Sequence, residues 1–172
     1  MKKFLIIATT FALISPIIVI AMFIYNIPSV QEIVAYNLRM DVSEGEIIAN
    51  YDEHGFHGDG VTCTILHFDK NNTLLQEIKK SKTWKSLPFD HTTVTLLYGY
   101  KNENRQAGPY LTDDSGKPLV PKITEGYYTL IDQQPLSEQV KNQNIFTRGS
   151  YNLTLGIYDT KDDLLYYCTL DT

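Results

Sequence analysis

Basic residues are in deficit in this chain. Its 172 residues include 15 lysines and arginines against 20 aspartates and glutamates. Because Lys2 and Lys3 belong to that total, the remainder carries 13 basic residues and a net charge of −7. No stretch combines basic residues with interleaved aromatic ones, the pattern typical of a nucleic-acid groove. We therefore expect no binding to nucleic acid, and no binding to anionic lipid by bulk charge.

Recognisable catalytic motifs are also missing. The sequence contains no Gly-x-Ser-x-Gly elbow, no His-Glu-x-x-His helix, no Cys-x-x-Cys pair and no Walker phosphate loop. Ser150, in "RGSYN", only begins an expected strand. Asp90 and His91 have no nucleophile at a spacing that indicates a triad. The sequence therefore assigns no catalytic residue.

Charge is absent altogether from one long stretch near the amino terminus. Residues Phe4–Tyr25, "FLIIATTFALISPIIVIAMFIY", carry no charged side chain. At ~1.5 Å per residue, a helix of this length crosses a bilayer core of ~30 Å. A cleaved signal peptide is the alternative, but its apolar region is usually ~7–15 residues long and ends at a small-x-small site. We predict an uncleaved membrane anchor over residues 1–25, with a signal peptide as the alternative.

The two lysines before this stretch set the expected orientation. Positive charge is retained on the cytoplasmic side of a membrane helix, so Lys2 and Lys3 place the amino terminus inside. The protein is then a single-pass membrane protein that contacts the bilayer through Phe4–Tyr25, with its carboxyl-terminal domain outside. Secretion after signal cleavage is the alternative.

The rest of the chain has the length of one domain. Residues 26–44 place apolar side chains at helical spacing behind Ser29 and Glu32, a capping-box pair, and we expect a linker with a short helix there. Residues 45–172 are numerous enough to bury one hydrophobic core. We expect them to form the extracytoplasmic domain.

Most of residues 45–172 has the pattern of β-strands. Alternating or β-branched runs occupy residues 45–51, 61–68, 92–100 and 126–132, and two more flank the turn "DTKDD" near the end. That last pair has the length of a β-hairpin. A helix is expected after Asn71 or Asn72, which can act as its cap. The fold class is therefore α+β: an amino-terminal transmembrane helix, then one small domain with a mostly antiparallel sheet and one or two helices.

Three segments together resemble a group of uncharacterised small exported or membrane-anchored proteins of Gram-positive bacteria. They are the loop "HGFHGDG", the strand "GYYTLID", and the terminal hairpin "SYNLTLGIYDT…LLYYCTLDT". The resemblance covers roughly residues 45–172 and implies location and domain extent, but no catalytic residue. One departure is that "EHGFHGDG" stands where the group suggests "HGGFHGDG".

The loop "DEHGFHGDG", residues 52–60, is the candidate metal site. His54, His57 and Asp59 supply two nitrogen donors and a carboxylate, which suit zinc, and His67 or His91 could add a ligand. The simpler interpretation is a turn, because glycines supply positive φ and aspartates hydrogen-bond to their own turn backbone. The loop therefore implies no cofactor, with zinc or another divalent metal as the alternative.

Cys63 and Cys168 are the only two cysteines. An even number of cysteines in an exported chain favours a disulfide. The alternative is that each is a small buried apolar residue, and the resemblance supports it, because many Gram-positive exported proteins avoid disulfides. Pairing requires Cα atoms ~4.4–6.8 Å apart, and therefore neighbouring or facing strands. The sequence leaves both states open.

Two functions follow as hypotheses. The first is a non-enzymatic module at the cell surface that binds an unidentified protein or surface ligand, or has an accessory role. The second is a metal-binding domain or metal-dependent hydrolase that uses His54 and His57. Metal analysis of the protein distinguishes them.

Overall fold

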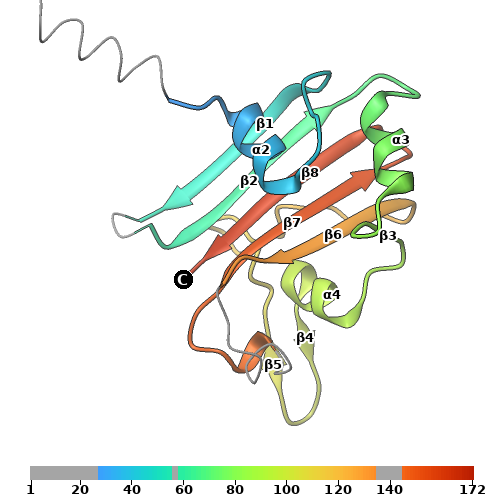
Figure 1. Ribbon diagram of the computed structural model, residues 1–172. Helices are drawn as coiled ribbons and strands as arrows, with labels where there is room; N and C mark the ends of the chain where they lie inside the picture. Colours follow the sequence, from blue (N-terminus) through green and yellow to red (C-terminus); the bar gives the residue numbers. More distant parts are fainter. Residues whose placement is uncertain (1–26, 56–57, 135–144) are drawn as a thin grey trace, which may run out of the picture.

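The computed structural model describes residues 27–55, 58–134 and 145–172. These residues form a small α+β domain built on one antiparallel sheet (Figure 1). The helices are α2 (Val30–Leu38), α3 (Thr73–Lys80), α4 (His91–Tyr98) and the 3₁₀ turn η1 (Ile145–Thr147). The strands are β1 (Glu46–His54), β2 (Gly60–His67), β3 (Lys85–Ser86), β4 (Tyr100–Lys101), β5 (Gln106–Ala107), β6 (Gly126–Asp132), β7 (Asn152–Asp159) and β8 (Leu164–Asp171).

The six-stranded sheet has the order β1-β2-β8-β7-β6-β3, and every pairing in it is antiparallel. Strands β7 and β8 lie in the middle, so the last segment of the chain forms the centre of the sheet. Strand β1 lies at one end, and the two-residue strand β3 lies at the other. Strands β4 and β5 form a separate small hairpin.

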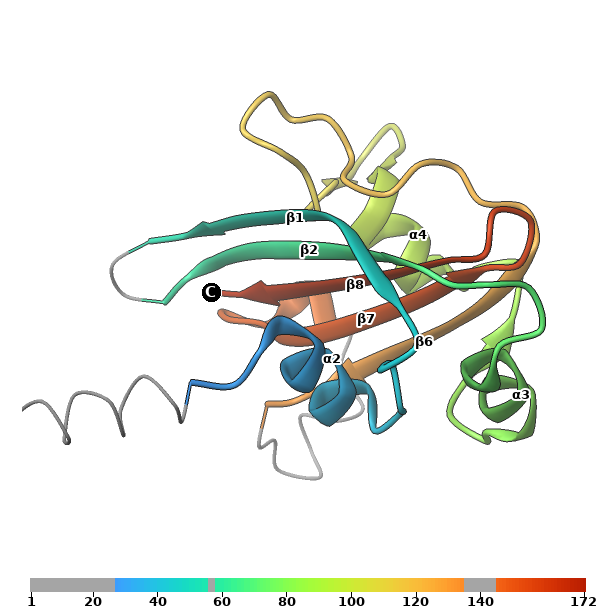
Figure 2. The same cartoon turned by 90° about the horizontal axis from the view of Figure 1, so that it is seen from above.

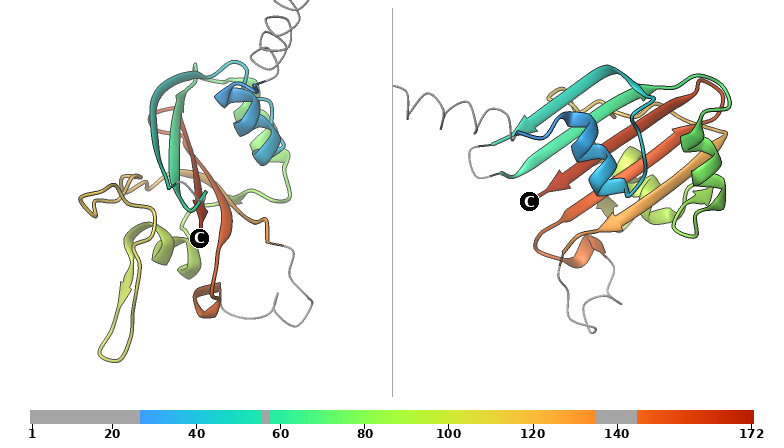
Figure 3. Two further views of the ribbon diagram at one scale, coloured as in Figure 1. Left: turned by 90° about the vertical axis from the view of Figure 1, so that its left-hand side faces the viewer. Right: turned by 45° about the horizontal axis from the view of Figure 1, so that its top comes forward.

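Helices cover the two faces of the sheet separately. Figure 2 shows α2 and α3 on one side and α4 on the other, and Figure 3 shows the same layers from two more directions. Alternate residues of a strand point to opposite faces. The central strands therefore supply side chains to two hydrophobic cores, one on each face of the sheet. On β7, Tyr158 packs with the α2 and α3 side chains, whereas Ile157 packs with the α4 side. Both side chains are fully buried.

Two hairpins predicted from the sequence are confirmed. Strand β1 pairs with β2 across the Gly-rich loop. Strand β7 pairs with β8, with Asn152 opposite Asp171 at one end and Asp159 opposite Leu164 at the other. The capping box is also present: the Ser29 side chain accepts a hydrogen bond from the Glu32 N–H, and Glu32 accepts one from the Ser29 N–H.

The segment predicted to be extended at residues 92–100 instead contains helix α4, so that prediction was wrong. Asp90 caps this helix by accepting a hydrogen bond from the Thr93 N–H at 2.9 Å. The buried Thr95 hydroxyl donates to the His91 carbonyl at 2.8 Å. The Thr95 hydroxyl is therefore satisfied by the helix backbone, although threonine favours strands.

The predicted membrane anchor, Phe4–Tyr25, lies outside the described residues. No helix in the described ranges has the length and apolar character that a membrane crossing requires. The anchor and its signal-peptide alternative both stay predictions.

Candidate functional site

The Gly-rich loop joins the end of β1 to the start of β2. The Gly55 N–H donates to the Asp59 carbonyl at 2.8 Å, and the Gly58 N–H donates to the Gly55 carbonyl at 3.0 Å. Gly60 follows with a φ of +158°, and a Cβ atom there would lie 2.0 Å from the Glu53 carbonyl oxygen. A side chain at residue 60 would therefore force the two strands apart. This glycine is needed for the close approach of β1 and β2.

His54 is held by a neighbour on its own strand. Its Nδ1 atom lies 2.6 Å from a carboxylate oxygen of Asp52. The His54 side chain is 29% exposed and that of Asp52 is 59% exposed. Because the contact uses Nδ1, the Nε2 atom of His54 is left for another partner.

Two carboxylates lie at the hydroxyl of Tyr51. The oxygens of Glu53 and Asp114 are 2.8 Å and 2.5 Å from the Tyr51 hydroxyl oxygen. The hydrogen bond to Asp114 is the main cause that raises the pKa of Tyr51 above its usual value, followed by partial removal from solvent and the contact with Glu53. A hydroxyl has only one proton to donate. One of the two carboxylates is therefore without this donor at any moment.

The candidate metal ligands are only partly brought together. His54 and Asp59 line one groove of about 470 Å³, together with Glu53 and Asp171. His57 lies outside the described residues. Within the described residues, no three histidine, cysteine or carboxylate side chains are grouped closely enough to hold a metal ion.

The two further histidines considered as ligands do not join this groove. His67 pairs with Glu46 at the opposite end of the β1–β2 hairpin, whereas His54 pairs with Gly60. His91 begins α4, and its ring meets the edge of Tyr100 with centroids 5.0 Å apart. The sheet register therefore separates His67 from the loop, and His91 lines a different groove.

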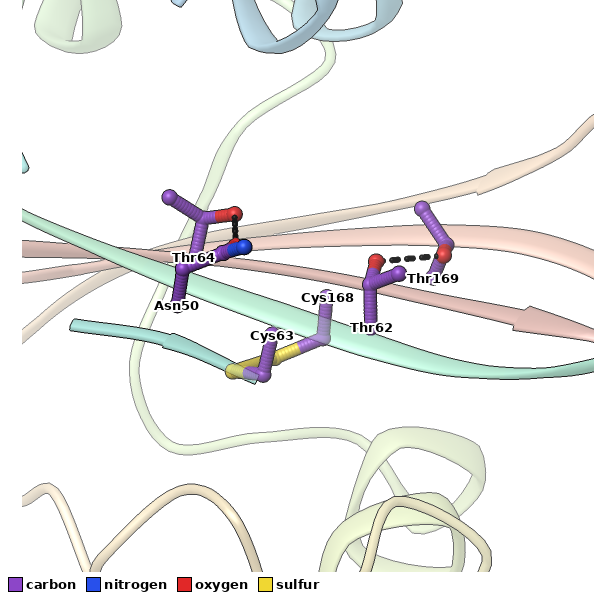
Figure 4. The surroundings of a disulfide bond; sticks show 6 residues. All are labelled: Asn50, Thr62, Cys63, Thr64, Cys168 and Thr169. Atoms are coloured by element: carbon purple, nitrogen blue, oxygen red, sulfur yellow. Dashed lines mark hydrogen bonds between the residues drawn. A yellow bond between two sulfur atoms is a disulfide. The ribbon is translucent and has the colours of Figure 1, made fainter. Parts of the chain in front are cut away.

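Cys63 and Cys168 are joined by a disulfide between the neighbouring strands β2 and β8 (Figure 4). They are directly opposite each other in the register, with Cα atoms 4.1 Å apart. Figure 4 shows the sulfur atoms on one side of the strands and two side-chain hydrogen bonds on the other side. Those bonds join Thr62 to Thr169 at 2.7 Å and Thr64 to Asn50 at 2.7 Å.

A second groove, of about 740 Å³, was not found by sequence reasoning. It lies between the start of α4, the β4–β5 hairpin and η1, and Arg105, Gln106 and Phe146 are among the residues that line it. Among the described residues, no carboxylate lines this groove, in contrast to the groove beside the Gly-rich loop. Its residues come from three separated segments without a common motif, so no local pattern could have indicated it.

Comparisons with protein-family models, with curated proteins and with solved structures give no significant match. The function of the protein is therefore inferred from the chemistry and geometry of this chain. The resemblance to exported proteins of Gram-positive bacteria stays an expectation.

Proposed function

We propose that this chain is a membrane-anchored extracytoplasmic protein, and that its domain is a non-enzymatic binding or accessory module at the cell surface. The observation that carries this proposal is the disulfide between Cys63 and Cys168. Disulfides persist outside the cytoplasm and are rare in the reducing cytosol. Both cysteines are buried, so the bond is an internal link of the fold. The proposal agrees with the orientation that Lys2 and Lys3 predict.

The contacts and surface position of the polar side chains near the Gly-rich loop support a binding role over a catalytic one. Asp52 holds His54, and Glu53 and Asp114 converge on the Tyr51 hydroxyl. These residues lie on the exposed edge strand β1 and on a surface segment. A catalytic centre usually places such groups around a concave, water-excluding site. The arrangement suits recognition of a partner at the surface better.

The test is the thiol state and location of the full-length protein in its own cells. Free thiols are blocked by rapid acid quenching and alkylation, and membranes are separated from cytosol and medium. We expect the protein in the membrane fraction with both cysteines protected until a reductant is added. Two alkylated thiols before reduction would overturn the proposed location. A trimmed product in the medium would replace the anchor by a signal peptide.

A metal-binding domain or metal-dependent hydrolase is the second candidate function. The observation that favours it is the contact between Asp52 and the Nδ1 atom of His54, because a metal-binding histidine usually holds a carboxylate or carbonyl with its second nitrogen. Metal analysis of the purified full-length protein tests it. Stoichiometric zinc that is lost in His54→Ala/His57→Ala, and retained in His91→Ala, would establish this function. Absence of bound metal after incubation with zinc would exclude it.

A further inference from the structure

Strand β1 is the long open edge of the sheet. It pairs with β2 on one side, and no described strand pairs with its other side. Only Tyr51 is partly buried among its residues, so no described helix covers either face of β1. Ile47 and Ile48 are 39% and 53% exposed. Such an edge offers unpaired backbone donors and acceptors to another extended chain.

The register identifies the backbone groups that point outward. Cys63 and Cys168 have Cα atoms 4.1 Å apart, a separation typical of the pairs that do not exchange backbone hydrogen bonds in an antiparallel ladder. The N–H and C=O of Cys63 therefore point the other way, toward its β1 partner Tyr51. Gly55, four residues after Tyr51, also points its backbone inward across the hairpin, because its N–H donates to the Asp59 carbonyl.

Backbone direction alternates along a strand, so the neighbours of Tyr51 point outward. These are Asn50 and Asp52, and the alternation continues to His54. Each presents one N–H and one C=O to the open side. The irregularity between Ile47 and Ala49 changes the pattern before Asn50, so the regular open edge extends from Asn50 to His54.

The acidic and basic residues of the β1–β2 hairpin and its flanking segments have one sign. From Asp41 to Asp69 the chain contains seven acidic residues and no lysine or arginine. Asp52 pairs with Thr62 and lies on the α2 side, whereas Glu53 pairs with Val61 on the α4 side, next to Tyr51 and Asp114. Exposed edges in natural proteins are often protected by lysine. This edge has carboxylates on both sides, which favour a basic partner.

A second copy of this chain is a poor occupant of the edge. Two β1 strands laid against each other would bring their acidic residues along one interface, and like charges on paired strands are destabilising. An extended segment with lysine or arginine on both faces would meet Asp52 on one side and Glu53 and Asp114 on the other. It would also supply a cation to the carboxylate that the single proton of Tyr51 leaves without a donor.

We infer that the β1 edge, from Asn50 to His54, is a docking strand for an extended basic segment of a partner protein, which adds to the sheet by β-augmentation. This inference rests on the proposed binding role. It does not depend on which side of the membrane the domain occupies. Purified full-length protein in nonionic detergent therefore separates a failure of the docking strand from a failure of the proposed location.

The probe is a twelve-residue peptide of the repeat Lys-Lys-Val-Val, which places lysine on both faces of an extended strand. It is compared with the same peptide methylated on every backbone nitrogen, which can donate from neither edge. We expect the first peptide to bind, and to slow amide hydrogen exchange at Asn50, Asp52 and His54. We expect the methylated peptide to bind at least about tenfold more weakly, because it lacks the backbone donors of an added strand. Binding should also weaken as salt rises.

Three variants complete the test. Asp52→Pro removes an outward N–H, which an edge strand tolerates, and should reduce binding at least as much as methylation does. Asp52→Asn/Glu53→Gln should weaken binding and flatten its salt dependence. Asp162→Asn, an exposed acid in the β7–β8 turn, is the matched control and should bind unchanged.

Two results would overturn the docking strand. Equal binding of the methylated peptide and the unmodified one would mean that charge alone attracts the peptide. Protection of β1 amides without any peptide, together with a dimer by ultracentrifugation, would assign the edge to a second copy of this chain. If Asp52→Pro fails to fold, the comparison between the two peptides on the native chain still decides between these outcomes.

Discussion

At the scale of single residues, Asn72 connects a helix cap to the buried core. Its side-chain oxygen accepts the Leu75 N–H at 2.8 Å and so caps α3. Its amide nitrogen donates to the Asp69 carbonyl at 2.7 Å and to the Tyr158 hydroxyl at 2.6 Å. Tyr158 is fully buried, and burial is the main cause that raises the pKa of its hydroxyl.

We predict that Asn72→Ala lowers the free energy of unfolding by about 2–3 kcal/mol, because it removes the cap and a partner of a buried hydroxyl. Asn72→Ser keeps a cap acceptor and buries no charge, so it should be affected less. Chemical unfolding of the full-length protein in detergent measures both. Equal stabilities of Asn72→Ala and the native chain would mean that neither the cap nor the contact with Tyr158 stabilises the fold.

Asn72 also separates what the sequence predicts from what it does not. The sequence indicated a cap at Asn71 or Asn72, because asparagine before an amphipathic run has a local meaning. Tyr158, which Asn72 contacts, is 86 positions away in the sequence. No local sequence pattern indicates such a contact. The acidic residues around Tyr51 are similar: Glu53 is a neighbour, but Asp114 arrives from a distant segment.

At the scale of elements, the hairpins β1–β2 and β7–β8 were predictable because alternation and turn residues are local signals. Helix α4 was not, because its threonines favour strands. Asp90 favours the helix because its side chain caps the amino terminus of α4. Burial by itself raises the pKa of the Asp90 carboxyl, but hydrogen bonds from Thr93 and Lys85 together lower it below 3.8.

This lowered pKa predicts a specific pH dependence. A carboxyl whose pKa is lower in the folded state stabilises the fold above its unfolded value of 3.8, and the effect is lost as pH falls through the folded value. Asp90→Asn keeps a cap acceptor but cannot ionise. We expect the native chain to be more stable than this variant at pH 7, and equally stable at about pH 2. A stability difference unchanged between these pH values would contradict the role of the charge.

The close packing of α2 against the sheet leads to a prediction for Gly156. A Cβ atom at Gly156 of β7 would lie 2.9 Å from a methyl of Leu38 and 3.0 Å from the ring of Trp84. Gly156→Ala should therefore destabilise the protein by about 1–3 kcal/mol through overpacking. Gly149→Ala, with no heavy atom within 4 Å of its Cβ position, is the control and should melt like the native chain. A Gly156→Ala variant of native stability would mean that α2 moves away without cost.

At the scale of the whole molecule, the disulfide joins residues 105 positions apart and links the edge hairpin to the central one. In the chain-entropy model, a disulfide that closes a loop of this size stabilises the folded protein by ~4–5 kcal/mol. We predict that reduction lowers the melting temperature by about 10 °C. Titration of the unfolded chain without reductant should find no free thiol. Two free thiols there, or a melting temperature unaffected by reductant, would contradict a stabilising disulfide.

We propose that the chain is anchored in the membrane and that its domain lies outside the cell. Labelling of intact cells with a membrane-impermeant, amine-reactive biotin reagent tests this most directly. Lys101 is exposed on the β4–β5 hairpin, whereas Lys2 and Lys3 are expected in the cytoplasm. Mass spectrometry of the recovered full-length protein locates the label. We expect label at Lys101 on intact cells, and at Lys2 or Lys3 only after the membrane is permeabilised. Label at Lys101 that also requires permeabilisation would place the domain inside the cell and contradict the proposed location.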